Sequence, residues 1–166
     1  MNKRTNLVFT LLQAAAVLIA LVGTVAAVFL AGWGGSAIGY FMDEQDYAYV
    51  GYAAVGLLTV ATVSVFSYGA LYHFFTLCQR LKLGTAFTPA NEKGMRRIAV
   101  CCGVCGGTLF LALLLAFAMI NGFALPFVYL LLLFSAAYSC IGLVAYALAL
   151  LVRRATAIQQ ENDLTI

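Results

Sequence analysis

Hydrophobic residues gather into four long runs that are separated by short polar segments. The runs cover residues 7–31, 50–78, 98–120 and 127–152. Each run reaches the roughly 20 residues of helix that cross about 30 Å of hydrocarbon. Because backbone polar groups in lipid must pair within their own segment, each run is best built as a helix. The pattern predicts an all-α integral membrane four-helix bundle, formed as a single transmembrane domain over residues 1–166.

The composition supports lipid as the main solvent of this chain. Hydrophobic residues make up 64% of the sequence and charged residues only 9%, whereas a soluble domain carries about 25% charged residues. The first run follows Lys3 and Arg4, as the apolar core of a signal peptide would. It is longer than the 7–15 residues of such a core, so we expect a retained first span.

The basic residues predict the orientation. All nine Lys and Arg lie before the first run, between the second and third runs, or after the fourth run. The positive-inside rule therefore places both termini, the loop 79–97 and the tail 153–166 in the cytoplasm. The loop 32–49 then lies outside. It is rich in glycine, and whether it dips back into the bilayer is left open by the sequence.

The central loop carries the signature of a helix start. Thr88 followed by Pro89 fits an N-cap and the first helical position. We expect a cytoplasmic extension of the third span that begins there and carries Arg96 and Arg97. These two side chains would meet anionic lipid headgroups, at about 1 kcal/mol for each basic residue near the surface.

Four of the five cysteines lie near the expected cytoplasmic face: Cys78, Cys101, Cys102 and Cys105. Their helical spacing makes a four-thiolate metal or redox site conceivable. Packing as small hydrophobic residues is the simpler interpretation, because the cytosol keeps thiols reduced. Reversible palmitoylation is a third alternative. Cys140 stands alone in the fourth span, where we expect it to pack.

Three other features invite a functional interpretation. His73 is the only histidine, and its expected interfacial depth leaves a ligand or proton-relay role open. Gly103-x-x-x-Gly107 is typical of close helix packing, either within the chain or in a homo-oligomer. Asp43, Glu44 and Asp46 carry oxygen ligands for a divalent cation, although a solvated acidic loop is the better interpretation, because the sequence shows no full ligand set.

Catalytic signatures are missing from the sequence. It contains no serine-hydrolase, phosphate-loop, dinucleotide-binding or zinc-protease motif. With one histidine and no carboxylate inside the expected spans, acid–base chemistry has few groups to use. We therefore expect a protein that is not an enzyme and that needs no cofactor.

Two segments resemble one family of bacterial membrane proteins, catalogued as domain of unknown function 2975. They are Leu83-Gly84-Thr85-Ala86-Phe87-Thr88-Pro89-Ala90-Asn91 with Met95-Arg96-Arg97-Ile98, and the closing Glu161-Asn162-Asp163-Leu164-Thr165-Ile166. The resemblance implies a multi-pass protein of the bacterial cytoplasmic (inner) membrane. Members of this family are often encoded beside a small helix-turn-helix regulator, which implies such a regulator as a partner.

Both matching segments fall on the expected cytoplasmic face. We therefore expect a non-enzymatic interaction platform that binds this regulator, with no direct contact to nucleic acid. Its partner-binding candidates are Phe87, Asn91, Arg96, Arg97, Glu161, Asn162, Asp163 and Leu164. The tail could instead pack beneath the bundle. Alternative functions are transport or export of a small molecule, and protection against membrane-active peptides through the outer loop.

Overall fold

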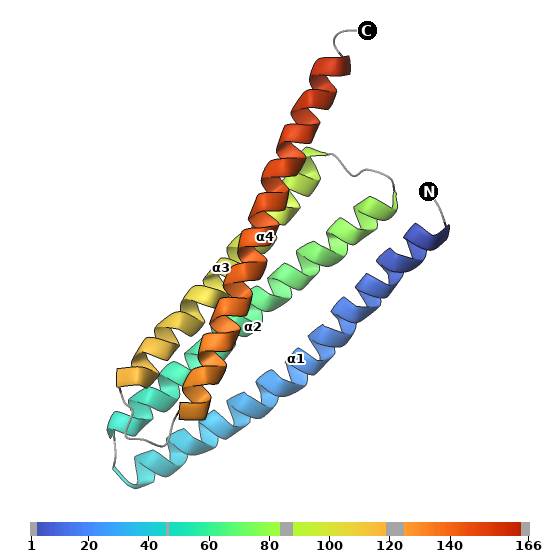
Figure 1. Cartoon of the computed structure of the whole chain (residues 1–166). Coiled ribbons are helices and arrows are strands. Elements are labelled where there is room, and N and C mark those ends of the chain that lie inside the picture. The colour runs from blue at the N-terminus through green and yellow to red at the C-terminus, as the bar shows by residue number, and fades with distance from the viewer. Residues whose placement is uncertain (1–2, 46, 84–87, 119–124, 164–166) are drawn as a thin grey trace.

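The computed structural model describes residues 3–45, 47–83, 88–118 and 125–163. Within these residues the chain forms four α-helices and no strand, which confirms the all-α fold class. All four helices are long and apolar enough to cross a membrane. They are α1 (Lys3–Asp43), α2 (Tyr47–Lys82), α3 (Pro89–Ala118) and α4 (Leu125–Asp163), shown in Figure 1.

The helices extend beyond the spans expected from hydrophobicity alone. The clearest case is α1, which stays helical through the glycine-rich stretch after residue 31 and ends at Asp43. This helix leaves no re-entrant turn over residues 32–43. Each glycine in a helix costs about 1 kcal/mol relative to alanine. The apolar span before these glycines already provides the helical nucleus, so the helix continues through them.

A short turn joins α1 to α2. The Glu44 N–H donates to the Tyr40 carbonyl oxygen at 3.1 Å, and Gln45 adopts a φ of 57°. That left-handed conformation ends many helices, although glycine usually provides it. The Phe41 ring of α1 then stacks on the Tyr49 ring of α2 with ring centres 5.2 Å apart, which joins the two helices at the hairpin tip.

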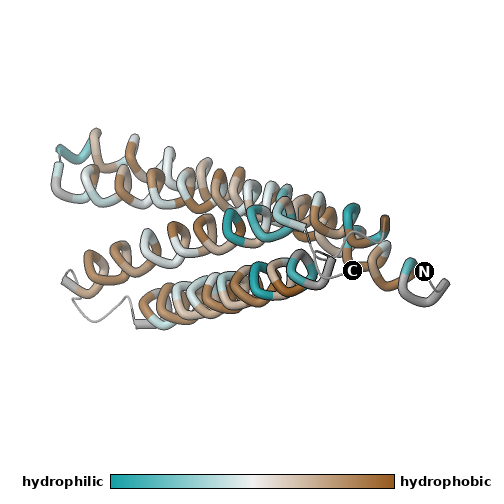
Figure 2. Tube along the Cα trace, turned by 90° about the horizontal axis from the view of Figure 1, so that it is seen from above, coloured by the Kyte–Doolittle hydropathy of each residue, from teal (hydrophilic) through white to brown (hydrophobic). Residues whose placement is uncertain are grey.

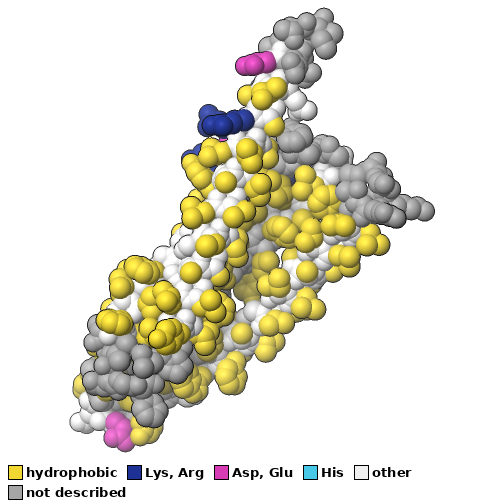
Figure 3. All heavy atoms as spheres, viewed as in Figure 1, with side chains coloured by type: hydrophobic (Ala, Val, Ile, Leu, Met, Phe, Trp, Pro, Cys, Tyr) yellow, Lys and Arg dark blue, Asp and Glu magenta, His cyan; other side chains and the backbone are white. Residues whose placement is uncertain are grey.

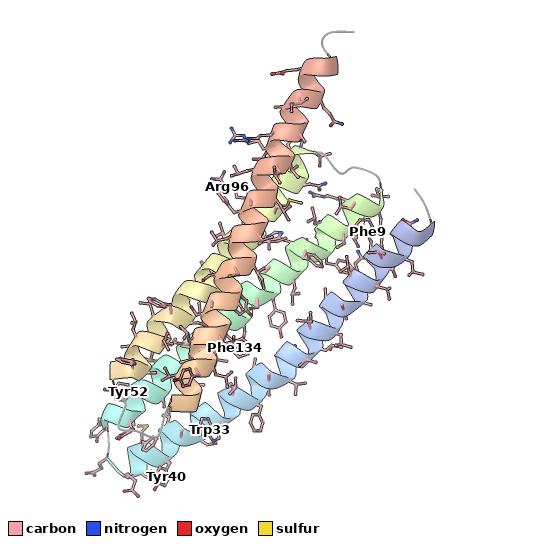
Figure 4. All side chains as sticks on the ribbon, in the orientation of Figure 1. Phe9, Trp33, Tyr40, Tyr52, Arg96 and Phe134 are labelled. Carbon is pink, nitrogen blue, oxygen red and sulfur yellow. The ribbon has the colours of Figure 1, made fainter. Side chains whose placement is uncertain are left out.

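Aromatic side chains mark this end of the molecule. Trp33 and Tyr40 of α1 and Tyr52 of α2 all lie near the tip (Figure 4), and all three are exposed. Tyr68 and Tyr72 lie about 20 residues further along α2. Tyrosine and tryptophan favour the headgroup level at both membrane surfaces. The two groups are therefore spaced as aromatic belts on either side of one bilayer.

The four helices pack as a series rather than as a closed four-sided bundle. Among the described residues, α1 packs on α2, α2 on α3, and α3 on α4, whereas α1 has no backbone contact with α3 or α4. The start of α1 and the end of α4 lie at the same end of the molecule (Figure 1). We call this the basic end, because the end of α2 and the start of α3 bring most of the lysines and arginines there.

The centre of the packing lies on α3. Cys105 is completely buried, and its thiol lies 3.7 Å from the Ser67 hydroxyl of α2 and 3.6 Å from the Val63 carbonyl oxygen. The Ser67 hydroxyl in turn hydrogen-bonds the Tyr138 hydroxyl of α4 at 2.8 Å. Helices α2, α3 and α4 therefore meet around one buried thiol. Such bonds between membrane helices contribute on average about 0.6 kcal/mol each.

Polar contacts also attach α1 to α2. The Tyr68 hydroxyl lies 2.6 Å from the Thr24 hydroxyl and donates to the Ala20 carbonyl oxygen at 3.3 Å. Near the basic end, the buried Gln13 amide donates to the Phe75 carbonyl oxygen at 3.4 Å. The Lys82 ammonium donates to the other side of the same amide, at Gln13 Oε1. The two helices are thus joined at two levels.

Two glycines bring α3 and α4 close together. A Cβ atom at Gly142 would lie 3.3 Å from both the Ala99 carbonyl oxygen and the Cys102 Cβ. One at Gly106 would lie 2.7 Å from the Ser139 hydroxyl oxygen. In contrast, outside the backbone of α3 itself, no described atom lies within 4 Å of a Cβ placed at residue 103 or 107. The Gly103 backbone nitrogen nevertheless lies 3.5 Å from the Cβ placed at residue 142, so Gly103 takes part in the close approach of α3 to α4. Packing of a second copy on the open side of this pair stays a prediction.

The outer surface between the two ends is apolar. Side chains such as Val25, Phe29 and Leu143 are about 70% exposed, and hydrophobic atoms cover most of the face in Figure 3. Hydrophilic residues gather toward the basic end and at the α1–α2 tip (Figure 2). Soluble monomers rarely expose apolar patches larger than a few hundred Å². This surface is suited to contact with lipid.

Replacing Gly142 by leucine is expected to force α3 and α4 apart. Overpacking of this kind costs about 1–3 kcal/mol. Gly107→Leu is the matched control, because it gains the same helix propensity in open space. A thermal ramp in detergent, read by dye reaction with the buried thiols, should give a lower midpoint for Gly142→Leu than for the control. Equal midpoints would contradict the close approach at residue 142.

Candidate functional site

The basic end gathers cations from three helices. Exposed or half-buried lysine and arginine side chains lie at the end of α2, along the first turns of α3 and near the end of α4. Arg80 and Lys82 lie in the last turn of α2, where cations interact favourably with the helix dipole. The described set is Arg80, Lys82, Lys93, Arg96, Arg97, Arg153 and Arg154.

The start of α3 is fixed by the predicted cap. The Asn91 N–H donates to the Thr88 carbonyl oxygen at 3.0 Å and lies 3.4 Å from the Thr88 hydroxyl oxygen. The Glu92 N–H donates to the same carbonyl at 3.2 Å. Helix α3 begins at Pro89, as the Thr-Pro signature predicts. The cap fixes the residue at which α3 begins, so the basic side chains from Lys93 to Arg97 lie in its first turns.

A pocket of about 240 Å³ lies between α2 and α3 at this end. We call it the basic pocket. On each helix, the residues that line the pocket recur at intervals of three, four and seven, so they share one helix face. It is lined by His73, Thr76, Leu77 and Arg80 from α2, and by Ala90, Lys93, Gly94 and Arg97 from α3.

An adjoining hollow extends the basic pocket along α3. It measures about 330 Å³ and shares His73, Lys93 and Arg97 with the basic pocket. Its remaining lining residues are Arg96, Val100 and Cys101. Arg96 therefore lies beside the basic pocket without lining it, on the side of α3 that faces away from α1 (Figure 4). Arg96 and Arg97 are adjacent in the sequence, but only Arg97 lines the basic pocket.

These residues were not predicted to lie together. Arg80 was placed in the loop 79–97, Lys93 fell on the expected helical extension of the third span without a role, and His73 was considered alone. The spacing carried the signal, since His73 and Arg80 are seven residues apart and Lys93 and Arg97 are four apart. What was missing was the continuation of α2 to Lys82, which brings Arg80 onto the same helix as His73.

The last part of α4 projects beyond the rest of the molecule. Gly142 lies level with Ala99, and α3 begins ten residues before that level, whereas α4 continues for twenty-one residues past it. About eleven residues therefore extend past the start of α3, roughly 16 Å of helix at 1.5 Å per residue. Figure 1 shows this end standing clear of the other helices. We call residues 153–163 the projecting segment.

The predicted partner-binding residues divide into three groups. Arg96, Arg97 and Glu161 are exposed, with Glu161 near the tip of the projecting segment. Asn91 is completely buried, so its side chain is not available to a partner. Phe87 and Leu164 lie outside the described residues, and Asn162 and Asp163 are described only by their helical backbone.

The cysteines serve the packing of α3. Cys78, Cys102 and Cys105 are buried and Cys101 is half-buried. Cys102 faces Gly142 of α4, whereas Cys105 faces α2. Among the described residues, no three His, Cys, Asp or Glu side chains are grouped to hold a metal ion. Cys140 is exposed, so the prediction that it packs is wrong.

These features define a multi-pass membrane protein whose charged groups lie at the helix ends. The family model for "Protein of unknown function (DUF2975)" matches residues 36–166, so the chain belongs to this family. The resemblance noted in the central loop and the closing segment is thereby confirmed, although most of α1 lies outside the match. No curated protein and no solved structure matches the chain.

Charged thiol reagents are expected to detect the positive potential of these hollows. In a variant that keeps only Cys101, an anionic methanethiosulfonate should react on the order of tenfold faster than a cationic one, because nearby cations attract it. Each rate is first divided by the rate of that reagent with a free thiol. Arg97→Gln should reduce the preference.

A variant that keeps only Cys140 is the control for this measurement. Its thiol is exposed on the apolar middle of α4, where charged reagents in a lipid nanodisc should react slowly whatever their sign. An equal rate of both reagents at Cys101 would contradict a positive hollow.

Proposed function

We propose that this protein is a non-enzymatic interaction platform of the bacterial cytoplasmic membrane. Its basic end binds a small soluble partner, for which the family resemblance suggests a helix-turn-helix regulator encoded nearby. The protein then holds or releases the regulator at the membrane without touching nucleic acid itself. Membership in a family of unknown function is compatible with this role and does not specify it.

The projecting segment is the observation that carries the proposal. A helix of about eleven residues would be marginal on its own in water. Here it continues a long membrane-spanning helix, which provides the costly nucleus. Ile158 is 59% exposed, and Gln159 and Glu161 are exposed beside it. A partner could bind this helix by its side and reach Arg96 on the neighbouring helix.

The arrangement of charges supports a cytoplasmic location for this end. Seven described lysines and arginines lie there, whereas the described part of the α1–α2 tip carries Asp43 and Glu44. Positive charge near helix ends favours the cytoplasmic side. A soluble regulator would then meet the basic end directly.

Transport and peptide protection remain weaker alternatives. The basic pocket and the adjoining hollow both lie at the basic end, and the Cys105 side chain at the centre of the packing is completely buried. A carrier would need a polar path near the bilayer midplane. Protection through the outer tip would depend on Asp43 and Glu44, which are exposed.

Labelling of intact cells tests the orientation. Single cysteines placed at Gln45 and at Thr85 in a cysteine-free chain should react differently with an impermeant maleimide added outside. We expect reaction at position 45 and none at position 85, because the basic loop stays inside. Permeabilised cells should label both positions. Labelling of position 85 but not of position 45 in intact cells would show the opposite topology, in which a cytoplasmic regulator could not reach the basic end.

Breaking the projecting segment tests the platform. Gln159→Pro removes a helical hydrogen bond and introduces a steric clash, at about 3 kcal/mol or more for a helix interior. Few packing contacts oppose the unwinding there. Capture of the neighbouring regulator by the membrane-embedded protein should fall about tenfold or more, measured by pull-down after crosslinking in cells.

Gln159→Ala is the matched control, since alanine keeps the helix and also removes the side chain. It should capture the regulator normally, and both variants should fractionate with the membrane. Charge reversal at Arg96 and deletion of residues 161–166 should also reduce capture. Normal capture by Gln159→Pro and by both of these changes would rule out the platform.

A further inference from the structure

We propose that the basic pocket is a binding site for a phosphate group, carried either by a lipid headgroup or by a small soluble compound. The site lies between α2 and α3 and does not depend on the proposed regulator. Three cationic side chains line it, Arg80, Lys93 and Arg97, together with the imidazole of His73. None of the described residues that line it carries a carboxylate.

The donors match the chemistry of phosphate. A guanidinium offers planar paired N–H donors that fit two phosphate oxygens, and lysine adds a compact positive charge. The His73 imidazole adds a further N–H donor in its neutral form. Lys93 and Arg97 lie four residues apart on one face of α3, so their charges repel each other, and an anion beside them reduces this repulsion. A phosphate between α2 and α3 would therefore stabilise the basic end as well as occupy it.

The size of the pocket suits a small group. Its 240 Å³ is below the roughly 300–1,000 Å³ of sites for drug-sized ligands. Gly94 helps to keep it open, because nothing lies within 4 Å of the position that a Cβ would take there. A larger side chain at residue 94 would extend into this space without altering the charge of the site.

The depth of the pocket matches the level of lipid phosphates. The Tyr72 ring lies beside His73 with ring centres 5.5 Å apart, and Tyr72 is 68% exposed. Exposed tyrosines of membrane proteins mark the headgroup layer. Basic pockets between helices at this level are typical sites for anionic headgroups. A soluble phosphate compound would reach the same groups from the water side.

Lys82 is excluded from this site by its own contact. Its ammonium donates to Gln13 Oε1 on α1, and it does not line the pocket. Arg96 is exposed one residue before Arg97 and lines only the adjoining hollow. The chain thus provides a matched cation that carries the same charge at almost the same place outside the basic pocket.

Binding is measured with the purified full chain in an uncharged detergent, with no regulator present. The probes are phosphatidylglycerol, phosphatidylcholine as a zwitterionic lipid, and inorganic phosphate against chloride at equal ionic strength. The readout is the rise in the thermal midpoint with probe concentration, from which an apparent Kd follows. We expect phosphatidylglycerol to raise the midpoint by several degrees more than phosphatidylcholine does.

Three variants separate a built site from general attraction. Arg97→Gln and Gly94→Leu should each weaken binding about tenfold or more, the first by removing a donor and the second by filling the pocket. Arg96→Gln should change binding by about twofold or less. Gly103→Leu controls for a leucine placed at an open helical glycine.

Each outcome decides the proposal. Stabilisation by phosphatidylglycerol alone assigns the site to a lipid headgroup, and stabilisation by inorganic phosphate as well assigns it to phosphate in general. Equal effects of the two lipids without any effect of inorganic phosphate would overturn it. So would equal losses in Arg96→Gln and Arg97→Gln, or unchanged binding in folded Gly94→Leu. None of these results bears on capture of the regulator, which is measured separately in cells.

Discussion

In hydrocarbon, each backbone N–H and C=O must find its partner within the chain, and this requirement shapes most of the molecule. It requires the apolar span of α1 to be helical, and this span is the nucleus from which the helix continues through four glycines between residues 32 and 39. Backbone pairing therefore sets the secondary structure within the membrane, and the side chains add little to it. They are free to determine which helices touch, and they do so with small residues at α3 and α4 and with hydroxyl groups at α2.

A different constraint acts on the polar ends of the helices. Above the apolar zone, water can satisfy the backbone, so a helix continues only where a cap or a long helical nucleus supports it. Thr88 supplies the cap for α3, and the membrane span supplies the nucleus for the last turns of α4. As a result the basic end offers two distinct surfaces. One is a recessed cluster of cations between α2 and α3, and the other is an exposed helix that stands alone.

The sequence predicted the features that follow from local rules. Four hydrophobic runs indicated four helices, and Thr88-Pro89 indicated the start of α3. Burial of Cys78, Cys102 and Cys105 agrees with the packing interpretation. Features that depend on the rotation of one helix against another could not be predicted. A Cβ at residue 103 or 107 would point into open space, while Gly142, which belongs to no repeat, makes the close approach to Ala99, Cys102 and the Gly103 backbone. The basic pocket was missed for the same reason, since it needs Arg80 and Arg97 from two helices in one register.

The serial packing of the helices has a consequence for biosynthesis. Each helix makes its backbone contacts with the helix synthesised immediately before or after it, and α1 relies on α2 alone. Contacts between chain neighbours form without the entropic cost of closing long loops. The chain can therefore assemble in the order in which the ribosome delivers it to the bilayer. The contact of Lys82 with Gln13 joins α1 to α2 without any residue of α3 or α4, so the α1–α2 hairpin does not depend on a later helix for this contact.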